Sequence, residues 1–284
     1  MTAARRLTSL QMAGFVADGA LRFDGIVPRA LGDAALAELA GGGPPSPFGA
    51  DPASPAAGWS GRPLAGLFRD WPALTAVLEL PAVAAVIESL LGPDPIYDHH
   101  YAHVIAARNE WSQPWHADAI LDPRRAAFDI QLCFFFHDTP RDMGGTMYLP
   151  GSHLRRVNEF AIARYQNFTA QEAMACPAGS LLVCHHGIWH CGQPNRTDRS
   201  RTMFKLRLNP RVAQRLVWDT ADLRDLRIGK VLSRDHGWYG HEVRLEIANR
   251  IRLWRDLTGD ARYDVDFWLT RIENDPLAGT SKPG

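Results

Sequence analysis

The sequence predicts a mainly β fold of the sandwich or barrel type, with helices on both sides of the β core. Between residue 95 and about residue 210, short runs of β-branched and aromatic residues are separated by Gly, Pro, Asn and Asp, a pattern typical of all-β domains and not of βαβ units. Before and after this region, apolar residues recur at helical spacing.

Composition limits the class of protein. The 284 residues are 46% apolar and 22% charged, which is usual for a globular chain. Lys plus Arg equals Asp plus Glu, at 31 each, so no net charge favours nucleic acid or anionic lipid as a partner. We therefore expect one domain over residues 1–284, with a mainly helical part at 1–94, a β core at 95–210 and a helical extension at 211–284.

The cysteines and the apolar segments bear on location. The four cysteines show no CxxC spacing and are expected to be buried thiols in a reducing compartment. The first 15 residues contain two arginines but no apolar core of signal-peptide length. No window approaches the roughly 18 apolar residues of a membrane span. These features predict a soluble, cytoplasmic protein without a membrane partner.

The N-terminal part contains a capped helix. Residues 7–17 have helical apolar spacing, Thr8 is placed to cap them, and Asp18-Gly19 is a stop signal. The segment LRFDGIV that follows has the character of a strand. Residues 41–57 are rich in Gly, Pro, Ser and Ala, so we expect a loop there, which could serve as a flap over the site.

A second helical stretch leads into the β core. Residues 72–91 have helical periodicity, broken at Pro81 and closed by Gly92-Pro93. The expected core strands lie in 96–107, 126–139, 144–153, 179–186 and 200–210. The tail from residue 212 to about 272 is helical, with apolar faces that include Leu245, Ile247, Ile251, Leu253 and Trp254.

A candidate metal site begins at Trp115-His116-Ala117-Asp118. In extended backbone, side chains at i and i+2 point the same way, so His116 and Asp118 can offer a nitrogen and an oxygen to one point. These are two of the three ligand types of the 2-His-1-carboxylate triad, which leaves open positions on iron. A His near an Asp is more often a hydrogen-bonded pair, so a third ligand is needed to support the hypothesis.

Three histidines, His185, His186 and His190, compete for that role, and a buried His can simply bond a backbone carbonyl. A hairpin argument favours His190. The loop 191–200 is rich in turn residues, so an antiparallel return would bring Arg201 beside His190. On the strand 201–209, Arg201 shares one face with Met203, Lys205 and Arg207, where a guanidinium can hold the carboxylate of a ligand.

From Leu7 to roughly Asn209 the sequence resembles the phytanoyl-CoA dioxygenase-like oxygenases. The motifs that carry the resemblance are LTSLQMAGFVADGALRFDGIVP, LLGPDP, WHAD, DTPRDMGGTMYLPGSH and GSLLVCHHGIWHCGQPNRTDRSR, in the order of the family. The chain departs from the family pattern at Ala117, where many relatives have Gln, and at Ser180, where Asp is usual.

The resemblance implies a double-stranded β-helix, in which His116, Asp118 and His190 bind Fe(II) and Arg201 binds the cosubstrate 2-oxoglutarate. Arg199 lies close enough in sequence to exchange roles with Arg201. The family uses O2 to convert 2-oxoglutarate to succinate and carbon dioxide while a hydrogen atom is removed from a substrate. Halogenating relatives lack the carboxylate, so the presence of Asp118 indicates hydroxylation or a related outcome.

Other residues are weaker candidates. His99 and His103 lie on one face of a strand and are candidates for contact with the substrate, although a structural hydrogen bond is the commoner role for such histidines. Thr146 is a candidate for lining the cosubstrate site.

The function expected is oxidation of a small organic molecule, most simply its hydroxylation, and the expected setting is specialised metabolism. Desaturation, epimerisation or ring closure would use the same hydrogen abstraction. A cupin-like isomerase or hydrolase, or a small-ligand binding protein, would have no use for 2-oxoglutarate.

Overall fold

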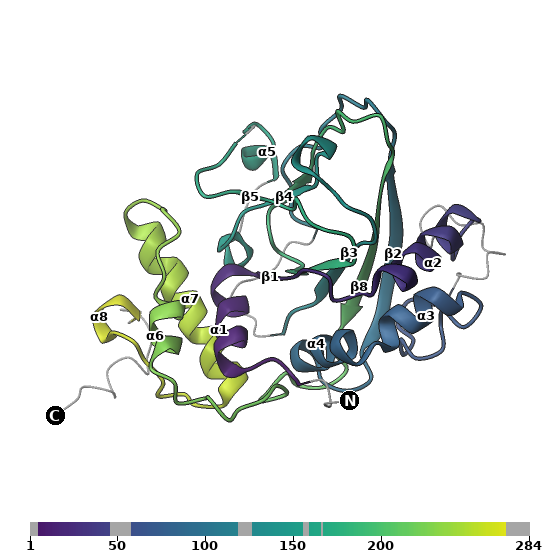
Figure 1. Ribbon diagram of the computed structural model, residues 1–284. Coiled ribbons are helices and arrows are strands. Elements are labelled where there is room, and N and C mark those ends of the chain that lie inside the picture. Colours follow the sequence, from purple (N-terminus) through teal and green to yellow (C-terminus); the bar gives the residue numbers. More distant parts are fainter. Residues whose placement is uncertain (1–4, 46–57, 119–126, 156–158, 166, 271–284) are drawn as a thin grey trace.

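Two antiparallel sheets lie at the centre of the protein (Figure 1). The computed structural model describes residues 5–45, 58–118, 127–155, 159–165 and 167–270. One sheet has the strand order β1-β6-β3-β8-β2, and the other has the order β5-β4-β7. The strands are β1 Ala20–Phe23, β2 Ile96–Ile105, β3 Ile130–Phe135, β4 Thr146–Tyr148, β5 Glu172–Ala173, β6 Ser180–His185, β7 His190–Gly192 and β8 Arg201–Asn209.

Helices lie before, between and after the strands in the chain. They are α1 Ser9–Asp18, α2 Arg29–Ala40, α3 Pro72–Glu79, α4 Pro81–Leu91, α5 Glu159–Ile162, α6 Arg227–Leu232, α7 His241–Thr258 and α8 Phe267–Thr270, with 3-10 turns at Arg141–Met143 and Ser152–Leu154. The described helices contain more residues than the strands, so the fold is mixed α/β with antiparallel sheets and not mainly β. Sequence periodicity did not identify α2, β5 or β7. The strands β5 and β7 are too short to show any periodicity.

The local signals in the N-terminal part are confirmed. Thr8 caps α1, and its hydroxyl and the Gln11 side chain exchange hydrogen bonds with each other's backbone in a capping box. Gly19 ends the helix in the left-handed conformation, at φ +71°. Pro81 begins α4 directly after α3 has ended, because its ring cannot continue a helix. The expected loop at 41–57 falls largely on residues 46–57, which lie outside the described residues.

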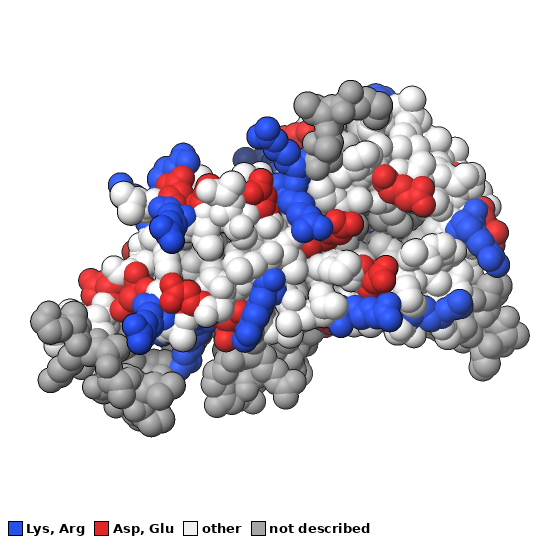
Figure 2. Space-filling model, turned by 90° about the horizontal axis from the view of Figure 1, so that it is seen from below, with Lys and Arg blue, Asp and Glu red and all other residues white. Residues whose placement is uncertain are grey.

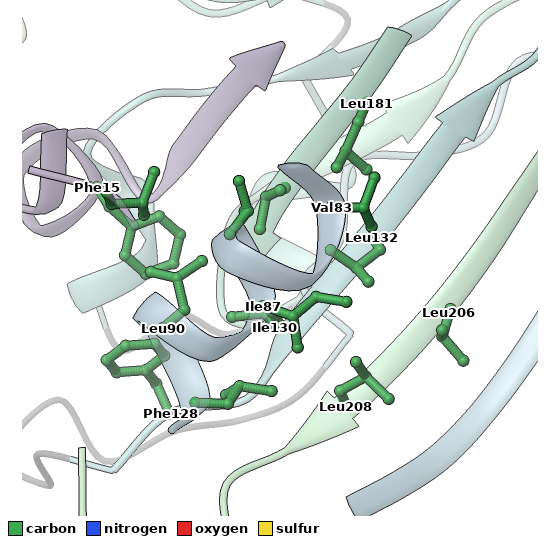
Figure 3. Close-up of a cluster of buried hydrophobic side chains, with 14 of the residues drawn as sticks. Phe15, Val83, Ile87, Leu90, Phe128, Ile130, Leu132, Leu181, Leu206 and Leu208 are labelled. Atoms are coloured by element: carbon green, nitrogen blue, oxygen red, sulfur yellow. The ribbon is translucent and has the colours of Figure 1, made fainter. Parts of the chain in front are cut away.

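The five-stranded sheet has one apolar face, and α1 and α4 cover it (Figure 3). Figure 3 shows Val83 and Ile87 of α4 against Leu132 of β3, with Leu206 and Leu208 of β8 beside them. Side chains alternate across a strand, so the opposite face of β3 and β8 points away from these helices. That opposite face, turned towards the smaller sheet, forms the candidate site.

The C-terminal helices α6 and α7 pack beside α1 (Figure 1). A buried group of charges joins them: His236 bonds Asp18 at 2.8 Å and Glu246 at 3.1 Å, and Arg250 pairs with Glu246. Burial opposes the charged forms, but these hydrogen bonds outweigh it, so the pKa of Asp18 is lowered and that of His236 is raised. The group ties the C-terminal extension to the first helix.

The prediction that Leu245 lies on a buried apolar face of the tail is wrong. Ile247, Ile251, Leu253 and Trp254 are buried, but Leu245 is 52% exposed. At 100° per residue, Leu245 lies on the opposite side of α7 from Ile247, Ile251 and Trp254, whereas Val243, which is closer to the start of the helix, packs against the core. Leu245 is therefore exposed because it does not share the face that these three residues bury.

No single described helix is long and apolar enough to cross a membrane; α3 and α4, bent by 63° relative to each other, meet that length and composition only as a pair. Their apolar side chains contribute to the core against the large sheet. On the face shown in Figure 2, acidic and basic side chains are interspersed, as the equal counts of the two charges would suggest.

Gly145 is expected to be intolerant of substitution. A Cβ added there would collide with the carbonyl oxygen and carbon of Met174, whose N–H donates to the Thr146 carbonyl at 2.8 Å. Gly145→Ala should therefore lower the free energy of unfolding by roughly 1–3 kcal/mol in urea titration. The control is Gly14→Ala in α1, where nothing lies within 4 Å of the added Cβ. This change should raise the free energy of unfolding by roughly 0.5–1 kcal/mol. Equal stability of the two variants would contradict the close contact.

Candidate metal centre and active-site cavity

Three potential ligands converge between the two sheets. The ligand atoms of His116, Asp118 and His190 all lie within 4.8 Å of one another. Nε2 of His116 is 3.5 Å from Oδ1 of Asp118, and Nε2 of His190 is 3.6 Å from its Oδ2. The structure thus brings together the three side chains that the sequence predicts as a triad.

Backbone pairing explains why the two histidines meet. His116 and His190 form an isolated antiparallel bridge, in which each N–H donates to the other's carbonyl, at 3.1 Å and 2.9 Å. Their ring centroids are 4.4 Å apart. Asp118 follows His116 by two residues, and its carboxylate lies beside both rings. The pairing of two segments far apart in sequence therefore creates the site.

Both imidazoles are oriented by a backbone carbonyl two residues earlier. Nδ1 of His116 lies 2.8 Å from the carbonyl oxygen of Pro114, and Nδ1 of His190 lies 3.0 Å from that of Ile188. A carbonyl oxygen can only accept a hydrogen bond, so Nδ1 carries the proton when the ring is neutral. The lone pair of Nε2 is then free to bind a metal ion. Hydrogen bonds of this kind fix the tautomer of histidines that bind metals.

The Asp118 carboxylate is held by two further donors. Its Oδ2 accepts hydrogen bonds from Gln131 Nε2 at 2.5 Å and from Lys205 Nζ at 2.9 Å. Burial would raise the pKa of Asp118, but the hydrogen bond to His116 and the charges of His190 and Lys205 outweigh it and lower the pKa. Asp118 is therefore ionised.

The sequence did not identify Gln131 or Lys205 as hydrogen-bond donors to Asp118. Two signals do mark them: Gln131 is the one polar residue in the run IQLCFF of β3, and Lys205 lies on the face of β8 predicted to be polar. A polar side chain in an otherwise apolar strand points to a buried partner.

The donor set fits a divalent transition metal. Burial lowers the pKa of His190 to about 4, so its ring is neutral; the pKa of His116 is raised, since its hydrogen bonds to Asp118 and Pro114 together outweigh burial. A cation replaces that proton when it binds. Bonds of about 2.0–2.2 Å place neighbouring ligand atoms about 3 Å apart, and Asp118 lies 3.5 Å and 3.6 Å from the two histidine nitrogens. Two imidazoles and one carboxylate are the ligands of non-haem Fe(II).

The competing histidines lie elsewhere. His185 packs against the rings of Phe15 and Phe128, with centroids 6.2 Å and 5.3 Å away, and His186 Nδ1 lies 2.9 Å from the Asp129 carbonyl oxygen. Burial lowers the pKa of both. They are structural histidines of the kind that the sequence allowed as an alternative.

A cavity of about 700 Å³ opens beside the three ligands. Its size is within the range of about 300–1,000 Å³ found for small-molecule sites. The weaker candidates His99, His103 and Thr146 all line it, together with Arg201. Burial lowers the pKa of His103 to about 4, so that ring is neutral. His99 hydrogen-bonds Asp98 at 2.5 Å.

Arg201 is buried in this cavity, with 5% of its surface exposed. Its NH1 donates to the carbonyls of Met143 at 3.0 Å and Gln193 at 3.3 Å, and burial lowers its pKa to about 10. Among the described residues no carboxylate pairs with it. Asp198, a possible partner in a surface pair, instead bonds Arg108. A buried guanidinium without a counter-ion is suited to an anionic ligand.

The prediction that a hairpin places Arg201 beside His190 is wrong. His190 begins β7 of the three-stranded sheet, whereas Arg201 begins β8 of the five-stranded sheet. The loop between them crosses from one sheet to the other, so the two side chains reach the same cavity from opposite walls. Arg199, the alternative candidate, is exposed.

Residues 63–203 match the family model for phytanoyl-CoA dioxygenase (PhyH). This part of the chain belongs to the PhyH family. The match includes the three converging side chains and Arg201. No curated protein matches the sequence.

Solved structures similar to this PhyH-family chain share its fold. The apo non-heme monooxygenase ThoJ has 23% identity and a TM-score of 0.52, over 69% of this chain and 75% of that one. The epimerase SnoN, in complex with Fe3+, alpha ketoglutarate and nogalamycin RO, has 16% identity and a TM-score of 0.52, over 71% and 84%. EctD from S. alaskensis, with 2-oxoglutarate and 5-hydroxyectoine, has 19% identity and a TM-score of 0.53, over 74% and 78%.

Proposed function

We propose that this PhyH-family protein is a non-haem Fe(II), 2-oxoglutarate-dependent oxygenase that oxidises a small organic molecule. The observation that carries the proposal is the presence, in one cavity, of His116, Asp118 and His190 together with the buried Arg201, which pairs with no carboxylate among the described residues. A metal isomerase or hydrolase would explain the three ligands but not Arg201, and a simple binding protein would explain neither.

In this proposal each group has one task. His116, Asp118 and His190 hold Fe(II) on one face, and the iron supplies the oxidation chemistry with O2 when it is bound. Arg201 binds the distal carboxylate of 2-oxoglutarate, and Thr146 lines the same cavity. Gln131 and Lys205 keep Asp118 ionised and fix its orientation.

The arrangement of strands supports a double-stranded β-helix. After β3 in the larger sheet the chain enters the smaller sheet at β4 and β5, returns at β6, crosses again at β7 and returns at β8. One apolar core includes side chains of α1, of the sheet strands and of α7, which supports a single oxygenase domain over the whole chain.

We propose hydroxylation as the reaction, because the Asp118 carboxylate occupies the position that a halide would need. Structures with this fold include a monooxygenase, an epimerase and a carbocyclase by their titles. The fold therefore supports desaturation, epimerisation and ring closure as well, and these remain alternative outcomes of the same hydrogen abstraction.

The test is spectroscopic. Fe(II)-loaded protein without O2 should develop a visible charge-transfer band when 2-oxoglutarate is added, because the 2-oxo acid chelates the metal. Succinate, which lacks the 2-oxo group, should give no band, and neither should 2-oxoglutarate without iron. Absence of the band with Fe(II) and 2-oxoglutarate together would refute the proposed function.

A further inference from the structure

Strand β8 presents more positive charge to the cavity than 2-oxoglutarate requires. Its cavity-facing residues are Arg201, Met203, Lys205 and Arg207. Arg201 is the proposed anchor of the cosubstrate. Arg207 donates to Asp129 at 2.7 Å, so its charge is matched by a carboxylate. Lys205 is the remaining cation of this strand.

Lys205 depends on the metal ligand for its partner. Its side chain is 12% exposed, and its hydrogen bond among the described residues is to Asp118 Oδ2, at 2.9 Å. Asp118 is also the one carboxylate among the described residues that line the cavity. When a metal ion binds, the negative charge of Asp118 is shared with it, and the ammonium group then lies close to a dication.

The charges of the loaded site can be compared. Fe(II) and Arg201 bring three positive charges, and Asp118 with dianionic 2-oxoglutarate brings three negative charges. The ammonium group of Lys205 is left without compensation in a largely buried position. Such a charge is unfavourable unless an anion lies beside it. The second ligand of the cavity is therefore expected to carry a negative group.

The rim of the cavity indicates what the rest of that ligand looks like. Three large apolar side chains line the cavity and are also exposed: Tyr101 at 42%, Val104 at 62% and Trp111 at 60%. Tyr101 is the β2 partner of Lys205 in the sheet register, and both side chains line the cavity. Grouped apolar side chains at the mouth of a cavity favour an apolar ligand surface.

We propose, building on the proposed oxygenase function, that the substrate is an organic acid. Its negative group binds Lys205, and its apolar or aromatic body lies against Tyr101 and Trp111. The anionic group could alternatively belong to the 1-carboxylate of 2-oxoglutarate itself, and the experiment separates these two sources.

The probes are benzoate and its neutral analogue benzamide, titrated without O2 into protein loaded with Fe(II) and 2-oxoglutarate. Calorimetry gives their affinity, and the charge-transfer band reports any change at the iron. Benzoate should bind wild-type protein at least tenfold more tightly than benzamide. Lys205→Met should remove this preference, and Lys205→Arg should restore most of it. The matched control is Lys230→Met, which removes an exposed lysine of α6 and should change nothing.

The outcomes are distinct. If the 2-oxoglutarate band never forms, the proposed function fails, and this inference falls with it. If the band forms but wild-type protein does not prefer benzoate, the inference alone is wrong. If Lys205→Met weakens the binding of 2-oxoglutarate as strongly as that of benzoate, Lys205 binds the cosubstrate, and the substrate assignment is overturned. Iron content and melting temperature of each variant show whether the metal site itself has been kept.

Discussion

Replacing His116, Asp118 or His190 by Ala is expected to abolish iron-dependent turnover of 2-oxoglutarate. Each change removes one of three ligands that lie within 4.8 Å of one another, and two remaining ligands cannot hold Fe(II) in the facial geometry. Losing the metal forfeits several kcal/mol of catalysis, so succinate release should fall by about three orders of magnitude or more. Succinate release and bound iron are measured together.

The control for this experiment is His186→Ala. His186 is a buried histidine four residues before His190, but its ring bonds the backbone of Asp129 and does not line the cavity. It should keep its iron and the charge-transfer band, even if its melting temperature falls. Full activity in His190→Ala together with loss in His186→Ala would show that the distal ligand has been assigned wrongly.

Arg201→Met is expected to weaken 2-oxoglutarate binding by more than tenfold. Arg201 is 5% exposed and has no carboxylate partner among the described residues, so a ligand carboxylate there gains a desolvated, charge-assisted contact. Loss of such a contact costs roughly 2–5 kcal/mol, and each 1.4 kcal/mol is about tenfold in affinity. The measurement is the 2-oxoglutarate concentration that gives half of the anaerobic charge-transfer band.

Arg199→Ala provides the matched control, since Arg199 is exposed and lies only two residues away. It should bind 2-oxoglutarate like wild-type protein. Arg201 also donates to the carbonyls of Met143 and Gln193, so unfolding must be followed in Arg201→Met to separate lost binding from lost structure. A defect in Arg199→Ala with normal binding in Arg201→Met would move the anchor to the neighbouring arginine.

Much of the local structure could be read from the sequence. The cap at Thr8, the stop at Gly19 and the break at Pro81 depend on residues close together in the chain, so their chemistry is complete in the sequence. The two faces of β8 follow from strict alternation, and Arg201 and Lys205 do face the cavity. The HxD pair also follows from alternation, because His116 and Asp118 are neighbours on one side of an extended segment.

The tertiary structure decided what local pattern could not. Three histidines within six residues have the same ligand chemistry, and the backbone bridge of His116 with His190 brings only His190 to the centre. The sequence suggested that Arg201 returns in a hairpin, but β7 and β8 lie in different sheets. The contacts of Gln131 and Lys205 with Asp118 likewise join three separate segments. Periodicity describes one segment at a time, whereas these contacts depend on how distant segments pair and pack.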